Sequence, residues 1–334
     1  MTVRERREAL EQQILSPYAC RSVDSRGRQR PVEPCPVRTC FQRDIDRIIH
    51  SKAFRRLMHK TQVFLQPEGD HYRTRMTHTI EVARIARTMA RGLQLNEDLT
   101  EAAAYGHDLG HTPFGHAGER VLHEIMPGGF AHNEQSLRVV DRLEKDGEGL
   151  NLPWEVRRGI LCHTGSDRAE TLEGQLLRLA DKIAYINHDI DDAIRGKIIY
   201  PMDIPLSVSQ VLGFTHSERI NTLVTDIIAS SAGRNEIVQS AACRDAMHEL
   251  REFMFEYVYR NPVAKGEEGK AQDMLRRLFE YYRADPDKLP PEFQEIRMEE
   301  SPERAVCDYI SGMTDKFAVE QFGEAFIPKA WSVK

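Results

Sequence analysis

Long apolar runs are missing from this sequence of 334 residues. No stretch approaches the roughly 20 apolar residues that a membrane-spanning helix requires. Residues 1–11 are rich in charge and contain no apolar segment of the kind that a secretory signal needs. These two absences predict a soluble, cytoplasmic protein that is not inserted in a membrane.

Cysteine pairs are also missing. The six cysteines are scattered, with no Cys-x-x-Cys spacing, at Cys20, Cys35, Cys40, Cys162, Cys243 and Cys307. This scatter argues against a zinc knuckle and a small disulfide scaffold, so we expect free thiols. A positive net charge is absent too. The formal value of -6 provides no general attraction for nucleic acid, but an acidic protein can still hold a local basic pocket for phosphates.

What the sequence does contain is helical periodicity. From Phe41 onward apolar residues recur at spacings of three to five, as one buried helix face requires. No alternating strand pattern of similar strength accompanies them. We therefore predict an all-α fold with an irregular, proline-rich N-terminal arm over 1–40, a catalytic core over 41–200 and a helical C-terminal extension over 201–334.

Turn-forming residues divide the periodic segments. Gly110, Pro113 and Gly115 predict a tight turn over His111–Gly115, and residues 196–213 are expected to form a loop or lid. The expected helices cover 77–91, 96–109, 133–144, 153–162, 172–195, 218–231, 241–259, 268–283 and 302–321.

The densest group of ionisable side chains lies between His107 and Glu119. His107 and Asp108 are adjacent, and their different lengths let both reach one ion beside a helix axis. His111 follows Asp108 by three positions, which puts both on one face if the helix continues. His116 and Glu119 repeat that spacing, so the carboxylate can orient the imidazole for proton transfer or in-line attack. An isolated His-Asp pair is common by chance, whereas this convergence favours a catalytic site.

Two other segments carry residues that suit such a site. His78 lies on an otherwise apolar helix face with Arg75 three positions before it, although a hydrogen-bonded core histidine would give the same pattern. Asp181 lies on a strongly apolar helix, where a buried carboxylate needs either a salt bridge or a metal. Tyr185 and Asp189 follow on the same face and could line a sugar pocket.

Two histidines and two aspartates thus form a mixed nitrogen and oxygen donor set. The candidate metal ligands are His78, His107, Asp108 and Asp181. Such a set suits one divalent ion such as Mn, Fe, Co, Ni or Zn, and Mg is also open. Since a divalent ion can activate water and offset charge on a phosphoryl oxygen, the set predicts phosphate-ester hydrolysis.

The same residues resemble the motif of the HD-domain metal-dependent phosphohydrolases, an all-helical superfamily. The run HDLGHTPFGHAGE, from His107 to Glu119, is similar to the signature of deoxyguanosinetriphosphate triphosphohydrolase-like proteins. Flanking segments agree with it over 41–195. They are FQRD from Phe41, FRRL from Phe54, KTQVF from Lys60 to Phe64, RMTH from Arg75 and ADKIAY from Ala180.

The resemblance implies hydrolysis of a deoxynucleoside triphosphate at the α-phosphate, giving deoxynucleoside and inorganic triphosphate. It also implies a homo-oligomer, with a hexamer preferred, and allows for a deoxynucleoside triphosphate activator. The metal ligands would be the four named above, while His111, His116 and Glu119 would act on the α-phosphate and leaving group. The implied substrate-binding residues are Arg75 and Lys182 at phosphate oxygens, Gln62, Tyr185 and Asp189 at the 3′-hydroxyl, and His132 near the phosphates.

Several alternatives remain open at this point. His132 could equally be an ordinary histidine at a helix start. The enzyme could be an HD phosphohydrolase acting on a nucleoside monophosphate, a cyclic dinucleotide or a guanosine polyphosphate. A nucleotide-sensing or single-stranded nucleic-acid-binding oligomer with slow turnover is a third interpretation. The sequence leaves the base preference, the metal and the choice of nucleophile undecided.

Overall fold

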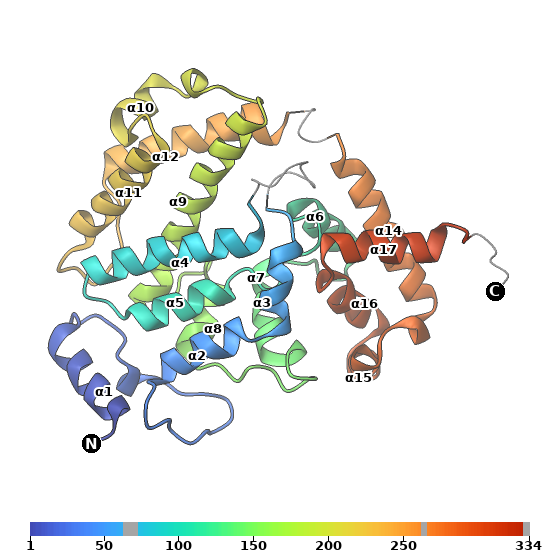
Figure 1. The fold of residues 1–334 in the computed structure, drawn as a ribbon, viewed down its shortest axis with the longest axis horizontal. Helices are drawn as coiled ribbons and strands as arrows, with labels where there is room; N and C mark the ends of the chain where they lie inside the picture. Colours follow the sequence, from blue (N-terminus) through green and yellow to red (C-terminus); the bar gives the residue numbers. More distant parts are fainter. Residues whose placement is uncertain (63–72, 262–265, 330–334) are drawn as a thin grey trace.

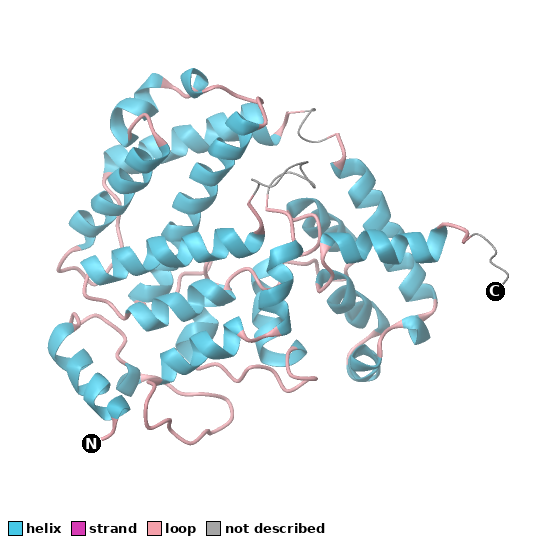
Figure 2. Ribbon diagram, in the orientation of Figure 1, coloured by secondary structure: helices cyan, strands magenta, loops and turns pink. Residues whose placement is uncertain are grey.

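The structure is a computed structural model that describes residues 1–62, 73–261 and 266–329. Within these ranges the regular secondary structure is helical and includes no β-strand, which confirms the all-α prediction (Figure 2). Two isolated bridges, Arg28 with Pro153 and Thr61 with Thr74, also occur there. None of the helices in the described ranges combines the length and apolar character needed to span a bilayer.

The central helices pack around α4 and α9, which lie side by side (Figure 1). This contact forms because one face of each helix is apolar: Val82 and Ala86 of α4 are buried in the same cluster as Ile183 of α9. The central helices are α2 (Cys40–Ile49), α3 (Lys52–Arg56), α4 (Arg75–Gly92), α5 (Glu97–Gly106), α6 (His116–Ile125), α7 (His132–Arg138), α8 (Trp154–Leu161) and α9 (Leu172–Arg195).

A second group of helices packs against α9. It contains α10 (Leu206–Leu212), α11 (His216–Ser231) and α12 (Ala241–Met254) (Figure 1). The prediction of a loop over 196–213 is wrong for its second half. Pro205 and Gly213 lie at the two ends of α10 and therefore do not interrupt it, and the helix buries Val208 and Leu212.

The C-terminal helices build a separate apolar cluster with α6. They are α14 (Glu268–Ala284), α15 (Pro291–Glu299), α16 (Pro302–Ser311) and α17 (Asp315–Phe326). Leu122 of α6 is buried there with Leu275 and Ile310. The expected single helix over 302–321 is wrong, because the chain turns at Gly312 and Thr314 caps a new helix by accepting the amide proton of Phe317.

The N-terminal arm is less irregular than predicted, since it begins with α1 (Val3–Ile14). A capping box between Thr2 and Glu5 starts this helix, although α1 buries none of its residues. Further along, the backbone amides of Cys20 and Asn96 both donate to Glu173 Oε1 over 3.0 Å, which fastens the arm to α5 and α9. The six cysteines are free thiols, as expected.

Two of the expected helices end in a π-helical turn. The helix expected over 133–144 is α7 followed by a π-helical turn at Val139–Leu143, and the helix expected over 241–259 is α12 followed by one at Phe255–Tyr259. Such turns are rare in proteins overall, but many of those that occur lie at functional sites. The second turn brings Phe255 and Tyr259 to the cavity described below.

Candidate active site

The four predicted metal ligands come from α4, α9 and the segment that follows α5. The expectation that α5 reaches Leu109 is wrong: the helix ends at Gly106, and His107 and Asp108 lie in the turn after it. This turn packs against α7, where a Cβ on Gly110 would lie 2.1 Å from the amide nitrogen of Ser136. Any side chain at position 110 would therefore clash with α7. The turn directs the side chains of His107 and Asp108 toward the space between α4 and α9.

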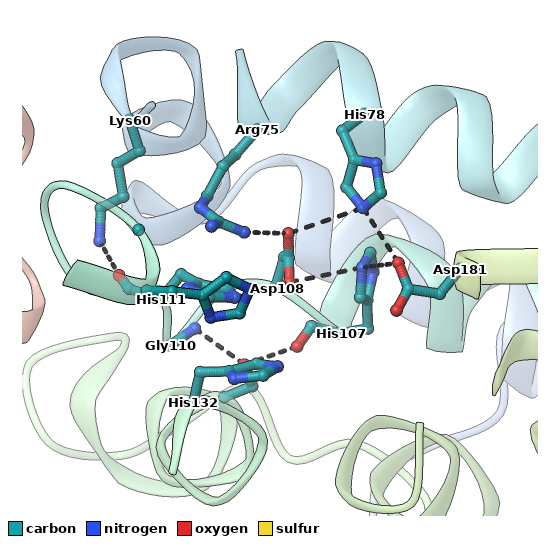
Figure 3. Close-up of polar contacts among 12 residues, drawn as sticks. Lys60, Arg75, His78, His107, Asp108, Gly110, His111, His132 and Asp181 are labelled. Atoms are coloured by element: carbon teal, nitrogen blue, oxygen red, sulfur yellow. Dashed lines mark hydrogen bonds and ion pairs between the residues drawn. The ribbon is translucent and has the colours of Figure 1, made fainter. Parts of the chain in front are cut away.

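The four predicted metal ligands converge in one place, as Figure 3 shows. His78 Nε2 lies 3.1 Å from Asp181 Oδ1 and 4.0 Å from Asp108 Oδ2. His107 Nε2 lies 3.4 Å from Asp108 Oδ1 and 3.7 Å from Asp181 Oδ1. We call these four side chains the metal cluster.

The orientation of His107 tests whether a metal ion fits. Its Nδ1 lies 2.6 Å from the carbonyl oxygen of Ala104, and this contact turns Nε2 toward the rest of the metal cluster. That Nε2 atom is buried and has no hydrogen-bond partner among the described residues. A buried imidazole nitrogen surrounded by two carboxylates and a second imidazole fits a divalent cation.

Both carboxyl groups of the metal cluster are held in their charged form. Burial alone would raise the pKa of Asp108, but His107 and Arg75 outweigh it and hold that pKa well below its usual range. Burial likewise acts to raise the pKa of Asp181, yet the hydrogen bond with His78 and the nearby histidines lower it to about 2. Both side chains are therefore available as anionic ligands.

Arg75 has a double role in the geometry. Its Nη1 donates to Asp108 Oδ2 over 2.8 Å, and the side chain is almost fully buried. Its Nε and Nη2 atoms are buried without a hydrogen-bond partner in the described part of the chain, and the residue lines the cavity. One edge of the guanidinium thus orients a metal-cluster carboxylate, while two donors remain for a phosphate oxygen.

The tight turn predicted over His111–Gly115 is present. Phe114 and Gly115 have positive φ angles of 61° and 55°, a region that is unfavourable for a phenylalanine. The helix does not continue to His111, but the turn still brings His111 Nε2 to 3.5 Å from Asp108 Oδ1. The turn ends at His116, where α6 begins.

A row of hydrogen-bonded side chains lies beside the metal cluster, and it ends at His163, whose ring centroid is 5.0 Å from that of His107. His116 Nδ1 lies 2.9 Å from Glu119 Oε2, and His132 Nδ1 lies 2.8 Å from Glu119 Oε1. His132 Nε2 continues the chain to His163 Nε2 over 3.1 Å, and His163 Nδ1 reaches the carbonyl oxygen of Ile160 over 2.7 Å. We call His116, Glu119, His132 and His163 the histidine row.

These partners determine where the protons of the histidine row lie. His163 Nδ1–H must donate to a carbonyl, so its Nε2 accepts, and His132 must donate from both of its nitrogens. Burial lowers the pKa of His163 to about 3. Burial also acts to lower the pKa of His132, but the hydrogen bond to Glu119 raises it above its usual value. For Glu119 burial is outweighed by hydrogen bonds from His116 and His132, which lower its pKa. His132 and Glu119 therefore form an ion pair.

The predicted sugar-binding residues lie along α9 on the same cavity. Tyr185 and Asp189 both line it, together with Gln62 from the segment before α4. Asp189 Oδ2 accepts a hydrogen bond from the Tyr259 hydroxyl, whereas Oδ1 is buried and finds no partner within the described ranges. Burial raises the pKa of Asp189 to about 7 and that of Tyr185 to about 12.

The cavity that joins these groups has a volume of about 800 Å³, which suits a small-molecule ligand. Nearly every predicted site residue lines it or, like His107, lies directly beneath it. Lys182 is the exception, because its side chain is exposed and is not among the lining residues. Val63 and Phe64, the end of the KTQVF segment, lie outside the described residues.

Several residues that line the cavity or support its lining were missed in the sequence. His163 supports the histidine row, Tyr259 holds Asp189, and Arg251 and Arg260 add positive charge to the lining. His163 lies in none of the motifs that marked the site. Arg251 and Tyr259 are each four positions from Phe255, but such spacing is typical of any helix face and does not mark a site. The π-helical turn at Phe255–Tyr259 explains part of this, since it shifts the register of the face that α12 would present.

The all-helical fold and the His/Asp cluster define an HD-domain phosphohydrolase, and the family models agree. Residues 75–186 match the model described as "HD domain", and residues 237–324 match the one described as "Phosphohydrolase-associated domain". A solved phosphohydrolase from Bacteroides thetaiotaomicron shares the fold with a TM-score of 0.53 at 18% identity, covering 84% of this chain and 69% of that chain.

Curated relatives show to which family of HD-domain proteins the chain belongs. The chain is 57% identical to a "Deoxyguanosinetriphosphate triphosphohydrolase-like protein" of Caldanaerobacter subterraneus, over 99% of this chain and 98% of the relative. It is 50% identical to a relative with the same name from Desulfatibacillum aliphaticivorans, over 98% and 99%. The chain belongs to the deoxyguanosinetriphosphate triphosphohydrolase-like family.

Proposed function

We propose that this protein hydrolyses deoxynucleoside triphosphates at the α-phosphate and releases deoxynucleoside and inorganic triphosphate. The observation that carries this proposal is the position of the histidine row beside the metal cluster in one cavity. A metal cluster alone would serve many phosphohydrolases, whereas the added row provides groups for a leaving oxygen. The names of the relatives support the same substrate class.

The metal cluster is proposed to hold one divalent ion through His78, His107, Asp108 and Asp181. When bound, such an ion offsets charge on a phosphoryl oxygen and favours ionisation of water. Its identity among Mn, Mg, Fe, Co, Ni and Zn is open to metal analysis of the purified protein.

The remaining roles follow from the protons and charges of the chain itself. Glu119 accepts Nδ1–H of His116, so that the imidazolium form of His116 can donate its Nε2 proton to the leaving oxygen as general acid. The two unpartnered donor atoms of Arg75 bind phosphate oxygens. The His132 cation adds positive charge beside them, because both of its N–H groups are already paired, and His111 stacks on it with ring centroids 4.0 Å apart. Lys182 does not line the cavity, and we keep it as a candidate for binding phosphate oxygens.

The sugar is proposed to lie against Gln62, Tyr185 and Asp189. Asp189 Oδ1 and Gln62 Oε1 are buried acceptors without a partner among the described residues, so either can accept a hydrogen bond from the 3′-hydroxyl. Tyr259 and Tyr185 enclose the same region. We propose that this enclosure leaves no room for a 2′-hydroxyl and so favours deoxyribose over ribose.

The test is product analysis by anion exchange after metal-loaded protein is incubated with each deoxynucleoside triphosphate, singly and mixed. Inorganic triphosphate with deoxynucleoside is the expected result, and activity found only in mixtures would identify a nucleotide activator. Orthophosphate or pyrophosphate would instead support an HD phosphohydrolase of another nucleotide. A covalent triphosphoryl adduct on His116, formed with release of the deoxynucleoside, would make that residue the nucleophile in place of the general acid.

The assembly proposed is a homo-oligomer in the cytoplasm, with a hexamer preferred. Apolar side chains exposed on and near α10, including Met202, Leu206 and Phe214, support burial against another copy. The division into 1–40, 41–200 and 201–334 is kept as the proposed domain organisation. Light scattering of the purified chain, with and without deoxynucleoside triphosphates, tests the oligomeric state.

A further inference from the structure

The turn over His111–Gly115, which we call the catalytic turn, is held in place by residues outside the segment 75–186 that matches the HD-domain model. Phe114 has a φ angle of 61°, which an isolated chain would seldom populate at a phenylalanine. A backbone in this region persists only where its surroundings fix it. The side chain of Phe114 is buried in the apolar cluster of α6 and the C-terminal helices, so part of that support comes from this cluster.

A single carboxylate from the C-terminal helices completes the support. Asp315, the first residue of α17, is almost fully buried, and its Oδ1 accepts the backbone amide proton of Phe114 over 2.9 Å. Its Oδ2 accepts the backbone amide proton of Thr61 over 2.9 Å and also the Thr61 hydroxyl. Asp315 thus joins the turn to the segment that precedes α4.

Lys60 makes a second link between the same parts. Its side chain is buried, and Nζ donates to the carbonyl oxygens of His111 and Ser311, the latter over 2.8 Å (Figure 3 shows the bond to His111). Ser311 ends α16, so Lys60 connects the end of α16 to the backbone of His111, at the start of the turn. Asp315 connects the start of α17 to the backbone of Phe114, near the end of the turn.

The segment held by Asp315 also positions the start of α4. The carbonyl oxygen of Lys60 accepts the amide proton of Arg75 over 3.1 Å, and Thr61 pairs with Thr74, the N-cap of α4. The turn lies directly against this segment, since a Cβ on Gly115 would lie 3.1 Å from Arg75 Nη2. Movement at Asp315 would therefore displace both His116 and Arg75.

We propose that Asp315 and Lys60 are positioning residues through which the C-terminal helices set the geometry of the catalytic turn. Neither residue lines the cavity, so they act on the reaction through His111, His116 and Arg75. The C-terminal helices are then part of the catalytic apparatus. The effect on turnover rests on the function proposed above, whereas the effect on the turn does not.

The experiment compares Asp315→Ala with Thr314→Ala in the full chain. Both variants weaken the start of α17, because Thr314 is its N-cap, but only the first removes the bonds to the turn. We expect Asp315→Ala to lower kcat about 10- to 100-fold per bound metal ion, with KM changed less, because small misplacements of catalytic groups have effects of this size. Thr314→Ala should lose thermal stability but keep kcat within about twofold.

Asp315→Asn and amide hydrogen exchange sharpen the test. Asparagine retains one side-chain oxygen acceptor, so its kcat should fall between those of the wild-type chain and Asp315→Ala. Amide exchange over 110–116 should accelerate in Asp315→Ala and stay unchanged in Thr314→Ala, whichever substrate the enzyme uses. Equal losses of kcat in the two alanine variants, or unchanged exchange in Asp315→Ala, would overturn the proposal. If the wild-type protein released no triphosphate, the proposed function would fail while the exchange result still decided this inference.

Discussion

The metal cluster and the histidine row share one cavity, but they are built by different means. His78 and Asp181 project from two long, packed helices, and His107 has no exposed surface. His116, in contrast, follows a turn with two positive φ angles, and 67% of its side chain is exposed. Packing of α4 against α9 thus fixes two members of the cluster, whereas hydrogen bonds between side chains fix the row. The half of the site formed by the cluster is mostly buried, whereas the half formed by the row is exposed at His116.

The largest effect should come from removing a ligand of the metal cluster. His107→Ala is expected to abolish metal binding and to lower turnover by a thousandfold or more, since an ion's stabilisation of transition-state charge is worth several kcal/mol. Metal analysis and triphosphate release measure the two effects. The matched control is His248→Ala, an exposed histidine of α12, which should retain both. Full activity of metal-free His107→Ala protein would remove the cluster from the reaction.

Removing His116 should separate the two halves of the cavity. His116→Ala is expected to keep the metal but lower kcat about a hundredfold to a thousandfold, the range of general acid catalysis. His123→Ala is the control: this histidine also lines the cavity but bonds only to the backbone of Phe130, and it should stay within a few-fold of wild type. Loss of metal from His116→Ala would contradict the independence of the two halves.

A pH-dependent contribution to stability should distinguish the histidine row in metal-free protein. The raised pKa of His132 stabilises the fold below the ordinary histidine value of about 6.5, and this stability disappears as pH rises through the raised pKa. The lowered pKa of Glu119 stabilises it above the ordinary glutamate value of about 4.3. The free energy of unfolding should thus exceed that of His132→Gln by roughly 2 kcal/mol near pH 5.5 and by less at high pH.

Denaturant titrations of the two proteins across this pH range check the prediction. A difference that grew as pH rose would show that His132 is neutral in the folded protein. Such a result would break the assignment of the His132–Glu119 ion pair.

The smallest effect should follow loss of the hydroxyl that supports Asp189. Tyr259→Phe removes one hydrogen bond, worth about 1 kcal/mol, so KM should rise roughly fivefold while kcat changes little. Steady-state kinetics with a deoxynucleoside triphosphate measure it. Tyr257→Phe changes an exposed tyrosine of the same π-helical turn and serves as the control. Equal KM values in the two variants would exclude Asp189 from sugar recognition.

The convergence of the four candidate metal ligands was predictable because they stand in three segments, RMTH, HDLGH and ADKIAY, that together resemble the motif of one family, although His107 next to Asp108 alone would mean little. The support of the histidine row was not predictable in the same way. His163 reaches His132 only because α8 packs against α7, and no local spacing encodes that contact. Helix α10 was missed because Pro205 and Gly213, which lie at its two ends, suggest a loop when the packing of the segment is not known.

The contact between Thr61 and Asp315 also sets an order of events during synthesis. The two residues are 254 positions apart, whereas all four metal-cluster residues have been made once Asp181 has been added. At a typical elongation rate of about 5–20 residues per second, the ribosome needs several more seconds to add Asp315. A nascent chain therefore carries its ion-binding side chains before it can complete the turn, and the last helices to be made finish the active site.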